Sequence, residues 1–411
     1  MDGERRKRDV WRAICIGCVC GMLFGYGTGA VAPGLPYISQ YLGLDAAGSG
    51  VVVSCLLVAA ALASPAAGVI ADRFGRDTAL CVSAVIYGIG ACIWAMSSAF
   101  WMLVIGRVLV GVGVGSVSFL GPMTVAERVP SEMRGRAVGA DQLMVTVGIL
   151  CSAIAGHLLG NGREWRLVAL LPVAGVLALI VLVMFQPNRV GGRSNVSAIS
   201  KPEGARRLLW GVRSVRRSFF VAVVLAAGVH LTGLNVAVYY APTVIAGVGA
   251  RPAVATAGSA LVAVVNVFCT MLALMLIDRV GRRPLMIGGL MIMAVSASGF
   301  GIVSEYAGSV GGTIALLAVF LAAGAIGPAA VFWVYVSEIF PFEVRATAVA
   351  WATFVQWMTD FLVSLIFPTM VARYSFAGAM RIFALVTLGT ICVSWLWMAE
   401  TRGRDMPELD A

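Results

Sequence analysis

The chain has 411 residues, of which 60% are hydrophobic and only 12% are charged, and its formal net charge is +10. This charged share is about half that of an average soluble domain. Twelve membrane helices of about 20 residues each would occupy roughly 240 positions, close to the hydrophobic content. The composition excludes a soluble enzyme, a disordered chain and a secreted disulfide scaffold. The nine cysteines all lie in apolar stretches, so we expect neither disulfides nor a metal site.

Apolar windows along the chain predict an all-α membrane protein with twelve spans. The first window follows a basic run and resembles a signal peptide, but it is long and eleven more follow, so we interpret it as a retained span. The expected spans cover residues 12–33, 49–71, 78–97, 101–121, 138–160, 165–185, 218–247, 257–277, 284–304, 312–336, 346–371 and 382–399.

The distribution of Lys and Arg predicts the orientation of these spans. Of the 30 basic residues, 24 fall in the N-terminal segment, the C-terminal tail and the loops on the same side, five fall in the opposite loops, and Arg107 lies within a span. The positive-inside rule therefore places both termini in the cytoplasm of a multi-pass protein of the plasma (cell inner) membrane. Since the basic residues are scattered over short loops, we expect the lipid bilayer rather than nucleic acid as the partner.

Two short phrases recur about half a chain apart. Asp72-Arg73-Phe74-Gly75-Arg76 returns as Asp278-Arg279-Val280-Gly281-Arg282, and the spacing of Glu127, Pro130 and Arg134 returns in Glu338, Pro341 and Arg345. The offsets are 206 and 211 residues, and each pair falls in equivalent loops. This repeat predicts two parallel six-helix halves, 1–185 and 218–411, joined by a basic cytoplasmic linker, 186–217, with a substrate site between them.

The repeated acids and bases predict ion pairs near the inner helix ends. We expect such pairs to hold the halves together while the site faces outward and to break as it opens inward. The alternative is that the charges only decorate inner loops. The predicted gating residues are Asp72, Arg73, Arg76, Glu127, Arg134, Asp278, Arg279, Arg282, Glu338 and Arg345.

Several motifs carry a family resemblance: Gly25-Tyr26 in the first span, Gly106-Arg107 in the fourth, Pro341 after Glu338, and Glu400-Thr401-Arg402-Gly403 in the tail. With them the sequence resembles the sugar porters of the major facilitator superfamily over nearly its whole length. The resemblance implies the major facilitator fold and a monomeric transporter of a small polar solute, a sugar or polyol, by alternating access. A carboxylated metabolite as substrate, and a solute sensor that does not transport, remain alternatives.

Departures from the family concern coupling. Proton-linked members have an Asp after the Gly-Tyr of the first span, where this chain has Gly27, although their partner Arg is present as Arg107. In the seventh span Val229 and His230 replace two glutamines that grip sugar in the family. Uniport and proton symport therefore both stay open, and protons remain a conditional partner.

Polar residues within the spans are the candidates for substrate binding, because amides donate and accept and an aromatic face covers the C–H side of a sugar. The resemblance implies this role for Gln142, Asn235, Asn266, Trp333 and Gln356, and His230 joins them as a substrate ligand or proton site. Interhelical hydrogen bonds, packing or a neutral core histidine are the alternatives.

Three further ionisable residues lie within spans, namely Arg107, Asp141 and Asp360. An isolated charge is costly there, so each needs a partner or a proton. Asp360 stands where the family commonly has Asn, and we hypothesise that Asp360 or Asp141 supplies proton coupling. Arg107 without its usual Asp suggests contact with an acidic substrate. No catalytic triad, zinc or phosphate-loop pattern is present, so we expect neither an enzyme nor a cofactor.

Overall fold

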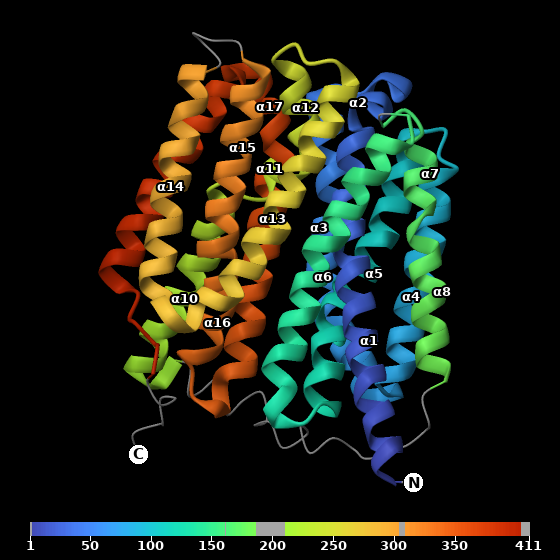
Figure 1. The fold of residues 1–411 in the computed structure, drawn as a ribbon, viewed down its shortest axis with the longest axis vertical. Coiled ribbons are helices and arrows are strands. Elements are labelled where there is room, and N and C mark those ends of the chain that lie inside the picture. Colours follow the sequence, from blue (N-terminus) through green and yellow to red (C-terminus); the bar gives the residue numbers. More distant parts are fainter. Residues whose placement is uncertain (1, 161, 186–209, 304–308, 404–411) are drawn as a thin grey trace.

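The computed structural model describes residues 2–160, 162–185, 210–303 and 309–403, and these residues are almost entirely helical (Figure 1). The first bundle of helices corresponds to the expected N-terminal half. It consists of α1 (Asp2–Gly29), α2 (Val31–Leu42), α3 (Ala46–Phe74), α4 (Arg76–Ala95), α5 (Phe100–Arg128), α6 (Ser131–Leu158), α7 (Trp165–Leu170) and α8 (Pro172–Met184).

The second bundle forms the C-terminal half. It consists of α10 (Arg213–Leu231), α11 (Val236–Tyr239), α12 (Ala241–Gly247), α13 (Pro252–Val280), α14 (Arg282–Ile302), α15 (Val310–Gly324), the π-helical turn η3 (Ala325–Ala329), α16 (Ala330–Glu338) and α17 (Phe342–Trp397). Residues 186–209, most of the expected linker, and 304–308 in the loop after α14 lie outside the described residues.

The helices account for twelve crossings of a membrane. Eleven helical segments of the described residues are long and apolar enough to span one. The longest, α17, has 56 residues, which at 1.5 Å per residue is about 84 Å and far exceeds one bilayer core. Its backbone leaves the helical region at Ser375, with φ 64° and ψ 169°. The kink divides α17 into two spans, which confirms the twelve-span major facilitator fold.

The expected seventh span, 218–247, is not one continuous helix. α10 ends at Leu231, and a short turn with Gly233 at φ 79° separates it from α11. The turn needs this glycine because other residues rarely adopt a positive φ. In a membrane, such irregular backbone is tolerated where it lines a cavity or is buried in protein. The break therefore sets Asn235 at a helix end inside the protein rather than on a lipid-facing helix.

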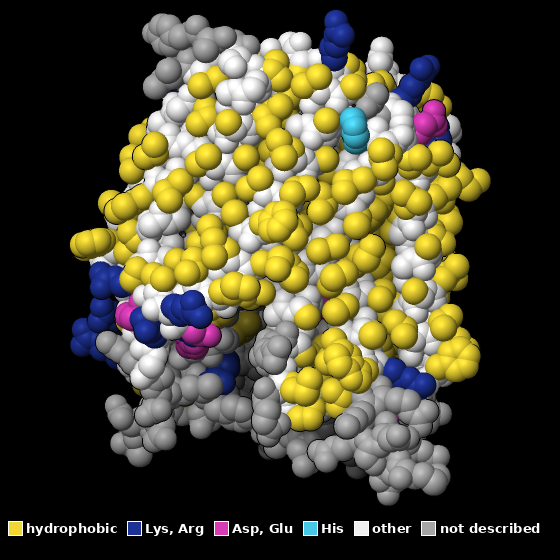
Figure 2. Space-filling view, in the orientation of Figure 1, with side chains coloured by type: hydrophobic (Ala, Val, Ile, Leu, Met, Phe, Trp, Pro, Cys, Tyr) yellow, Lys and Arg dark blue, Asp and Glu magenta, His cyan; other side chains and the backbone are white. Residues whose placement is uncertain are grey.

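The two halves lie side by side, and both ends of the chain lie on one side, called here the terminal side (Figure 1). On the opposite side the halves touch: Nδ1 of His157 on α6 is 3.0 Å from Oγ1 of Thr256 on α13, and Gly50 of α3 lies directly against the backbone of Leu365 on α17. On the terminal side the surface is hollowed between the halves (Figure 2). The interface is thus closed opposite the termini.

Large apolar side chains cover the outside of both bundles (Figure 2). Val69, Val295 and Leu385 are each about 70% exposed, at 69%, 73% and 68%. A soluble protein rarely exposes such a continuous apolar surface, whereas the acyl chains of a bilayer favour it. The charged side chains gather at the ends of the bundle, as expected of an integral multi-pass membrane protein.

A bulky side chain at Gly50 is expected to force the halves apart opposite the termini. A β-carbon there would collide with the carbonyl oxygen of Leu365, a backbone atom that moves only with α17. Gly50→Trp should therefore open this side and close the terminal side. In a cysteine-free background, pulsed EPR between spin labels at the exposed Phe74 and Val280 should record a shorter distance than without Gly50→Trp.

Gly389→Trp is the matched control for this experiment, because Gly389 is exposed and a β-carbon there would meet nothing within 4 Å. It should leave the spin-label distance unchanged. An unchanged distance in Gly50→Trp as well would contradict the idea that this close approach closes the interface.

Candidate functional site

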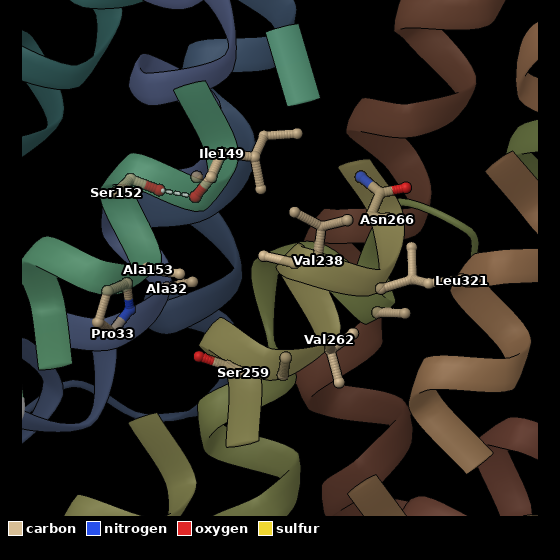
Figure 3. Close-up of a pocket in the computed structure, with 14 residues that line it drawn as sticks. Ala32, Pro33, Ile149, Ser152, Ala153, Val238, Ser259, Val262, Asn266 and Leu321 are labelled. Atoms are coloured by element: carbon tan, nitrogen blue, oxygen red, sulfur yellow. Dashed lines mark hydrogen bonds between the residues drawn. The ribbon is translucent and has the colours of Figure 1, made fainter. Parts of the chain in front are cut away.

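A pocket lies between the two halves, on the side where they touch (Figure 3). Its polar side chains are Ser152, Ser259 and Asn266, and Asn266 is only 7% exposed. None of its fourteen lining residues carries a charge. They are Gly29, Ala32, Pro33, Ile149, Ser152 and Ala153 of the N-terminal half, and Ala237, Val238, Ala241, Ser259, Val262, Ala263, Asn266 and Leu321 of the C-terminal half. In this conformation the pocket has a volume of about 20 Å³, room for about one water molecule, so its lining shows only that the boundary between the halves is apolar and uncharged on this side.

Asn235, Tyr239 and Asp360 form a buried polar cluster in the C-terminal half. Nδ2 of Asn235 donates to Oδ2 of Asp360 at 2.8 Å, and the Tyr239 hydroxyl donates to the same oxygen at 3.0 Å. Asp360 is 2% exposed. Asn235 and Tyr239 come from the break after α10 and from α11, whereas Asp360 comes from α17. The structure thus joins a predicted substrate residue to a predicted coupling residue.

The other predicted substrate residues lie apart from this cluster. Gln142 is exposed on α6, and Trp333 is 37% exposed beside the ring of Phe332, with ring centroids 5.5 Å apart. Gln356 lies on α17 one turn before Asp360, and its buried Oε1 has no hydrogen-bond partner among the described residues. Such an oxygen needs a donor, and a bound solute can provide one.

His230 is 7% exposed near the end of α10, and its Nδ1 lies 3.3 Å from the carbonyl oxygen of Ala226. Because a carbonyl only accepts, Nδ1 carries the proton in this arrangement. A neutral ring with this proton has Nε2 as an acceptor, whereas an imidazolium has a second donor there. Both the ligand and the core interpretation of His230 agree with this geometry.

Trp357 is a site candidate that the sequence reasoning missed. It follows Gln356 on α17, is 8% exposed, and its ring centroid lies 5.7 Å from that of Phe24 on α1 in the other half. The contact puts an aromatic face at the boundary between the halves. The available signal was its place beside Gln356, within one turn of Asp360.

Arg107 is almost wholly buried, at 1% exposed, and hydrogen-bonds to backbone carbonyls. It donates to Gly27 at 3.0 Å, Val52 at 3.2 Å and Val53 at 3.3 Å. Its guanidinium also lies 5.0 Å from the ring centroid of Trp94. Among the described residues no carboxylate lies within 4.0 Å of it. Carbonyls thus accept three hydrogen bonds from the five N–H donors of this guanidinium, and the contact between Arg107 and an acidic substrate stays a prediction.

Gly27 leaves no space for the acid that proton-linked relatives carry. A β-carbon at this position would lie 2.7 Å from the hydroxyl of Tyr87 and 2.8 Å from Cγ2 of Val114. The Tyr87 hydroxyl in turn donates to the carbonyl of Leu23 at 3.1 Å. Tyr87 thus occupies part of the volume that an Asp at position 27 would need.

Asp141 lies on α6 at 6% exposure, packed against α1 and α5. β-Carbons built at Gly21 and Gly121 would each lie 3.3 Å from its Oδ1, so the two glycines make room for the carboxyl group. This Oδ1 has no hydrogen-bond partner in the described part of the chain. Asp141 is therefore enclosed within the N-terminal half.

The repeated charged phrases form equivalent ion pairs at the terminal side. Arg76 pairs with Asp72 at 3.1 Å and with Glu127 at 3.2 Å. In the other half Arg282 pairs with Asp278 at 3.0 Å and with Glu338 at 2.7 Å. Each of these four ion pairs joins residues of one half. In this conformation the pairs therefore brace each half, and the gating role stays a prediction.

The tail adds a second layer to the pair in the C-terminal half. The Thr401 hydroxyl donates to Glu338 at 2.6 Å, and Glu400 accepts the backbone N–H groups of Arg282 and Arg283, each at 3.0 Å. Partial burial opposes ionisation of Glu400, but the backbone N–H donors, that of Arg402 foremost, outweigh it and hold the pKa below its ordinary value.

The remaining gating candidates are dispersed. Arg279 is exposed, Arg73 lies over the ring of Phe74, and Arg345 donates to the carbonyl of Phe340. The side chain of Arg134 lies outside the described residues.

Placing the family acid at position 27 should destabilise this protein. Gly27→Asp forces the new side chain against Tyr87 and Val114, and overpacking of this kind costs about 1–3 kcal/mol. Thermal unfolding in detergent, followed by tryptophan fluorescence, should show a lower midpoint. Adding Tyr87→Phe removes the colliding hydroxyl and should recover part of the loss. Gly211→Asp, at a glycine with open space around it, should leave the midpoint unchanged; an unchanged midpoint in Gly27→Asp would contradict the steric argument.

Comparisons with known proteins agree with this architecture. The family model described as "Sugar (and other) transporter" matches residues 13–189 and 194–411. The putative metabolite transport protein YwtG of Bacillus subtilis (strain 168) is 28% identical over 436 residues, covering 99% of this chain and 95% of that protein. The D-xylose transporter of Levilactobacillus brevis is 29% identical over 445 residues, covering 99% and 96%.

Solved structures give the same result. The crystal structure of a D-xylose-proton symporter matches with a TM-score of 0.84 and 26% identity, over 96% of this chain and 99% of that one. The fold, the repeated ion pairs and the family match lead to one assignment. The chain belongs to the sugar porter family of the major facilitator superfamily and is a membrane transporter, not an enzyme.

Proposed function

We propose that this protein carries a neutral monosaccharide or polyol across the plasma membrane by alternating access, as a monomer with both termini in the cytoplasm. The observation that carries the proposal is the uncharged lining at the boundary of the halves, where Asn266 and two serines lie among apolar side chains. Relatives named as glucose, D-xylose and arabinose transporters support the substrate class.

The proposal favours a sugar over a carboxylated metabolite. A carboxylate bound in a membrane site needs a cation or several N–H donors. Arg107 is the basic residue that the sequence places within a span. It is 1% exposed and already donates to three carbonyls. The lining of the pocket adds no other basic side chain.

We assign the substrate contacts to amides and rings near the boundary of the halves. Asn266 lines the pocket, and the buried Oε1 of Gln356 lacks a hydrogen-bond donor among the described residues. The hydrogen bond to Asp360 fixes the orientation of the Asn235 amide. Gln142, His230 and Trp333 complete the proposed site from α6, α10 and α16. With the termini in the cytoplasm, the conformation described is inward-open, and the solute leaves through the hollow on the terminal side.

Alternating access follows from rocking of the two halves, 1–185 and 218–411, about this site. The contacts of His157 with Thr256 and of Gly50 with Leu365 close the outer side. When the outer side opens, the ion-paired groups around Arg76 in one half approach those around Arg282 in the other half, and together they form the proposed inner gate.

A substrate panel in proteoliposomes tests the proposal. Purified protein should exchange labelled D-glucose, D-xylose or L-arabinose for the same unlabelled sugar inside the vesicles, in a saturable manner. Gluconate, which resembles glucose in size but carries a carboxylate, should not exchange. Exchange of gluconate without exchange of any neutral sugar or polyol would overturn the assignment in favour of a carboxylated substrate.

Truncating Gln356 should weaken sugar binding without abolishing transport. Gln356→Ala removes one amide, and a neutral hydrogen bond contributes about 0.5–1.5 kcal/mol, so the KM for exchange should rise about two- to thirteenfold. Gln40→Ala, at an exposed position on α2, is the matched control and should keep the original KM. Equal KM values for the two variants would remove Gln356 from the site.

A further inference from the structure

We propose that proton coupling in this protein resides in the C-terminal half, at Asp360, where the carboxyl group positions Asn235 and so links proton binding to sugar binding. This inference rests on the proposed function and adds the ion that drives it. It departs from the position in the first span where proton-linked relatives carry their acid.

The N-terminal half cannot accommodate an Asp at the position of Gly27, where proton-linked relatives carry one. Gly27 has no room for a side chain because the Tyr87 hydroxyl and Val114 fill the space beside it. A charge within the bilayer is costly unless it has partners, and the Arg107 guanidinium donates to the carbonyls of Gly27, Val52 and Val53. A guanidinium held in this way stays protonated at all working pH values and exchanges no proton.

In the described part of the chain, Asp360 is surrounded by neutral hydrogen-bond donors rather than by cations. Asn235 and Tyr239 both donate to its Oδ2, and no Lys or Arg of the described residues forms an ion pair with it. The titratable groups that face it are His230 from α10, Tyr239 from α11 and Tyr240, which follows α11. Two neutral donors stabilise an ionised carboxylate, yet without a cation in contact a proton can still bind to it.

Asn235 links this carboxyl group to the proposed sugar site. One N–H of the Asn235 amide is committed to Asp360, which fixes the direction of the amide. When Asp360 takes a proton from water on the open side, it attracts that N–H less strongly, and the amide becomes free to donate to a sugar hydroxyl. Proton and sugar then each raise the affinity for the other, because linkage is reciprocal.

Tyr239 links the same carboxyl group to the boundary between the halves. Tyr239 lies on α11, which packs against α1 and α2 of the N-terminal half, and its hydroxyl donates to Asp360. Protonation of Asp360 weakens this hydrogen bond, so the position of α11 at the boundary between the halves responds to the proton.

Asp141 is the rival carboxyl group. It is enclosed by Gly21, Gly121 and neighbouring atoms of its own half, and no hydrogen bond of the described structure connects it to a proposed sugar ligand. Asp360 has such a connection, to Asn235. The experiment therefore includes Asp141→Asn as the competing assignment.

The experiment compares two activities of the same proteoliposomes, using the sugar that the panel identifies. Sugar exchange at equal pH moves no net proton and reports on folding and binding. Accumulation of sugar under an inward proton gradient, together with acidification of a pH dye inside the vesicles, reports on coupling. Unmodified protein should show both activities, and Glu164→Gln, which removes an exposed carboxylate, should match it.

Asp360→Asn retains the shape and the acceptor of the protonated acid. It should keep exchange within about threefold of the unmodified rate, lose accumulation above equilibrium, lose sugar-driven acidification, and make exchange independent of pH. Tyr239→Phe is a second variant that removes one donor from Oδ2 and leaves the acid in place. It should remain coupled, with the pH midpoint of exchange moved to higher pH because the ionised form loses a donor.

Three results would overturn the inference. Asp360→Asn that still accumulates sugar shows that coupling lies elsewhere, and loss of accumulation only in Asp141→Asn assigns it to Asp141. Unmodified protein that exchanges sugar without any accumulation is a uniporter, which refutes coupling and leaves the proposed function intact. Absence of exchange for every neutral solute refutes the proposed function itself.

Discussion

The requirement that a charge inside the bilayer find partners governs the interior of this protein, and Arg107 shows how it is met. The guanidinium draws its acceptors from the backbone of α1 and α3, through Gly27, Val52 and Val53, and packs on Trp94 of α4. A single side chain of α5 thus ties four helices together without any acid. Since peptide carbonyls cannot take up a proton at working pH, this arrangement gives stability but offers no proton acceptor at Arg107.

The charged residues at the terminal side act within each half, and the contacts between halves lie at the other end. Arg76 with Glu127, and Arg282 with Glu338, connect loops of one bundle. The halves meet instead through the small residue Gly50, whose missing side chain lets α3 approach α17. Ion pairs lie within each half, whereas helix packing of α3 against α17 and of α6 against α13 joins the halves, and this division suits movement of the halves as separate bodies.

Much of the fold followed from the sequence because apolar length and the Lys and Arg bias report on spans directly. The kink at Ser375 lies in the loop expected between the spans 346–371 and 382–399, whereas the break at Gly233 was not predicted, since it lies within a run that reads as one apolar span, 218–247. The directions of side chains could not be predicted either. Lipid and protein core are both apolar, so hydropathy does not distinguish the lipid-facing side of a helix from the side that packs inside the protein. Asp141 and Asp360 were both recognised as buried acids, and only the packing of distant helices distinguishes them.

The difference between those two acids follows from the regularity of the backbone around them. Asp141 lies where the long helices α1, α5 and α6 pack through glycines, and continuous helices leave no free backbone or adjustable turn beside it. Asp360 faces the turn after α10, where the helix is interrupted and Asn235 ends a short irregular segment. Irregular backbone in a membrane protein can change its hydrogen bonds at lower cost than a helix can. The half that carries the break is therefore the half in which binding of a small ion can alter the direction of a substrate ligand.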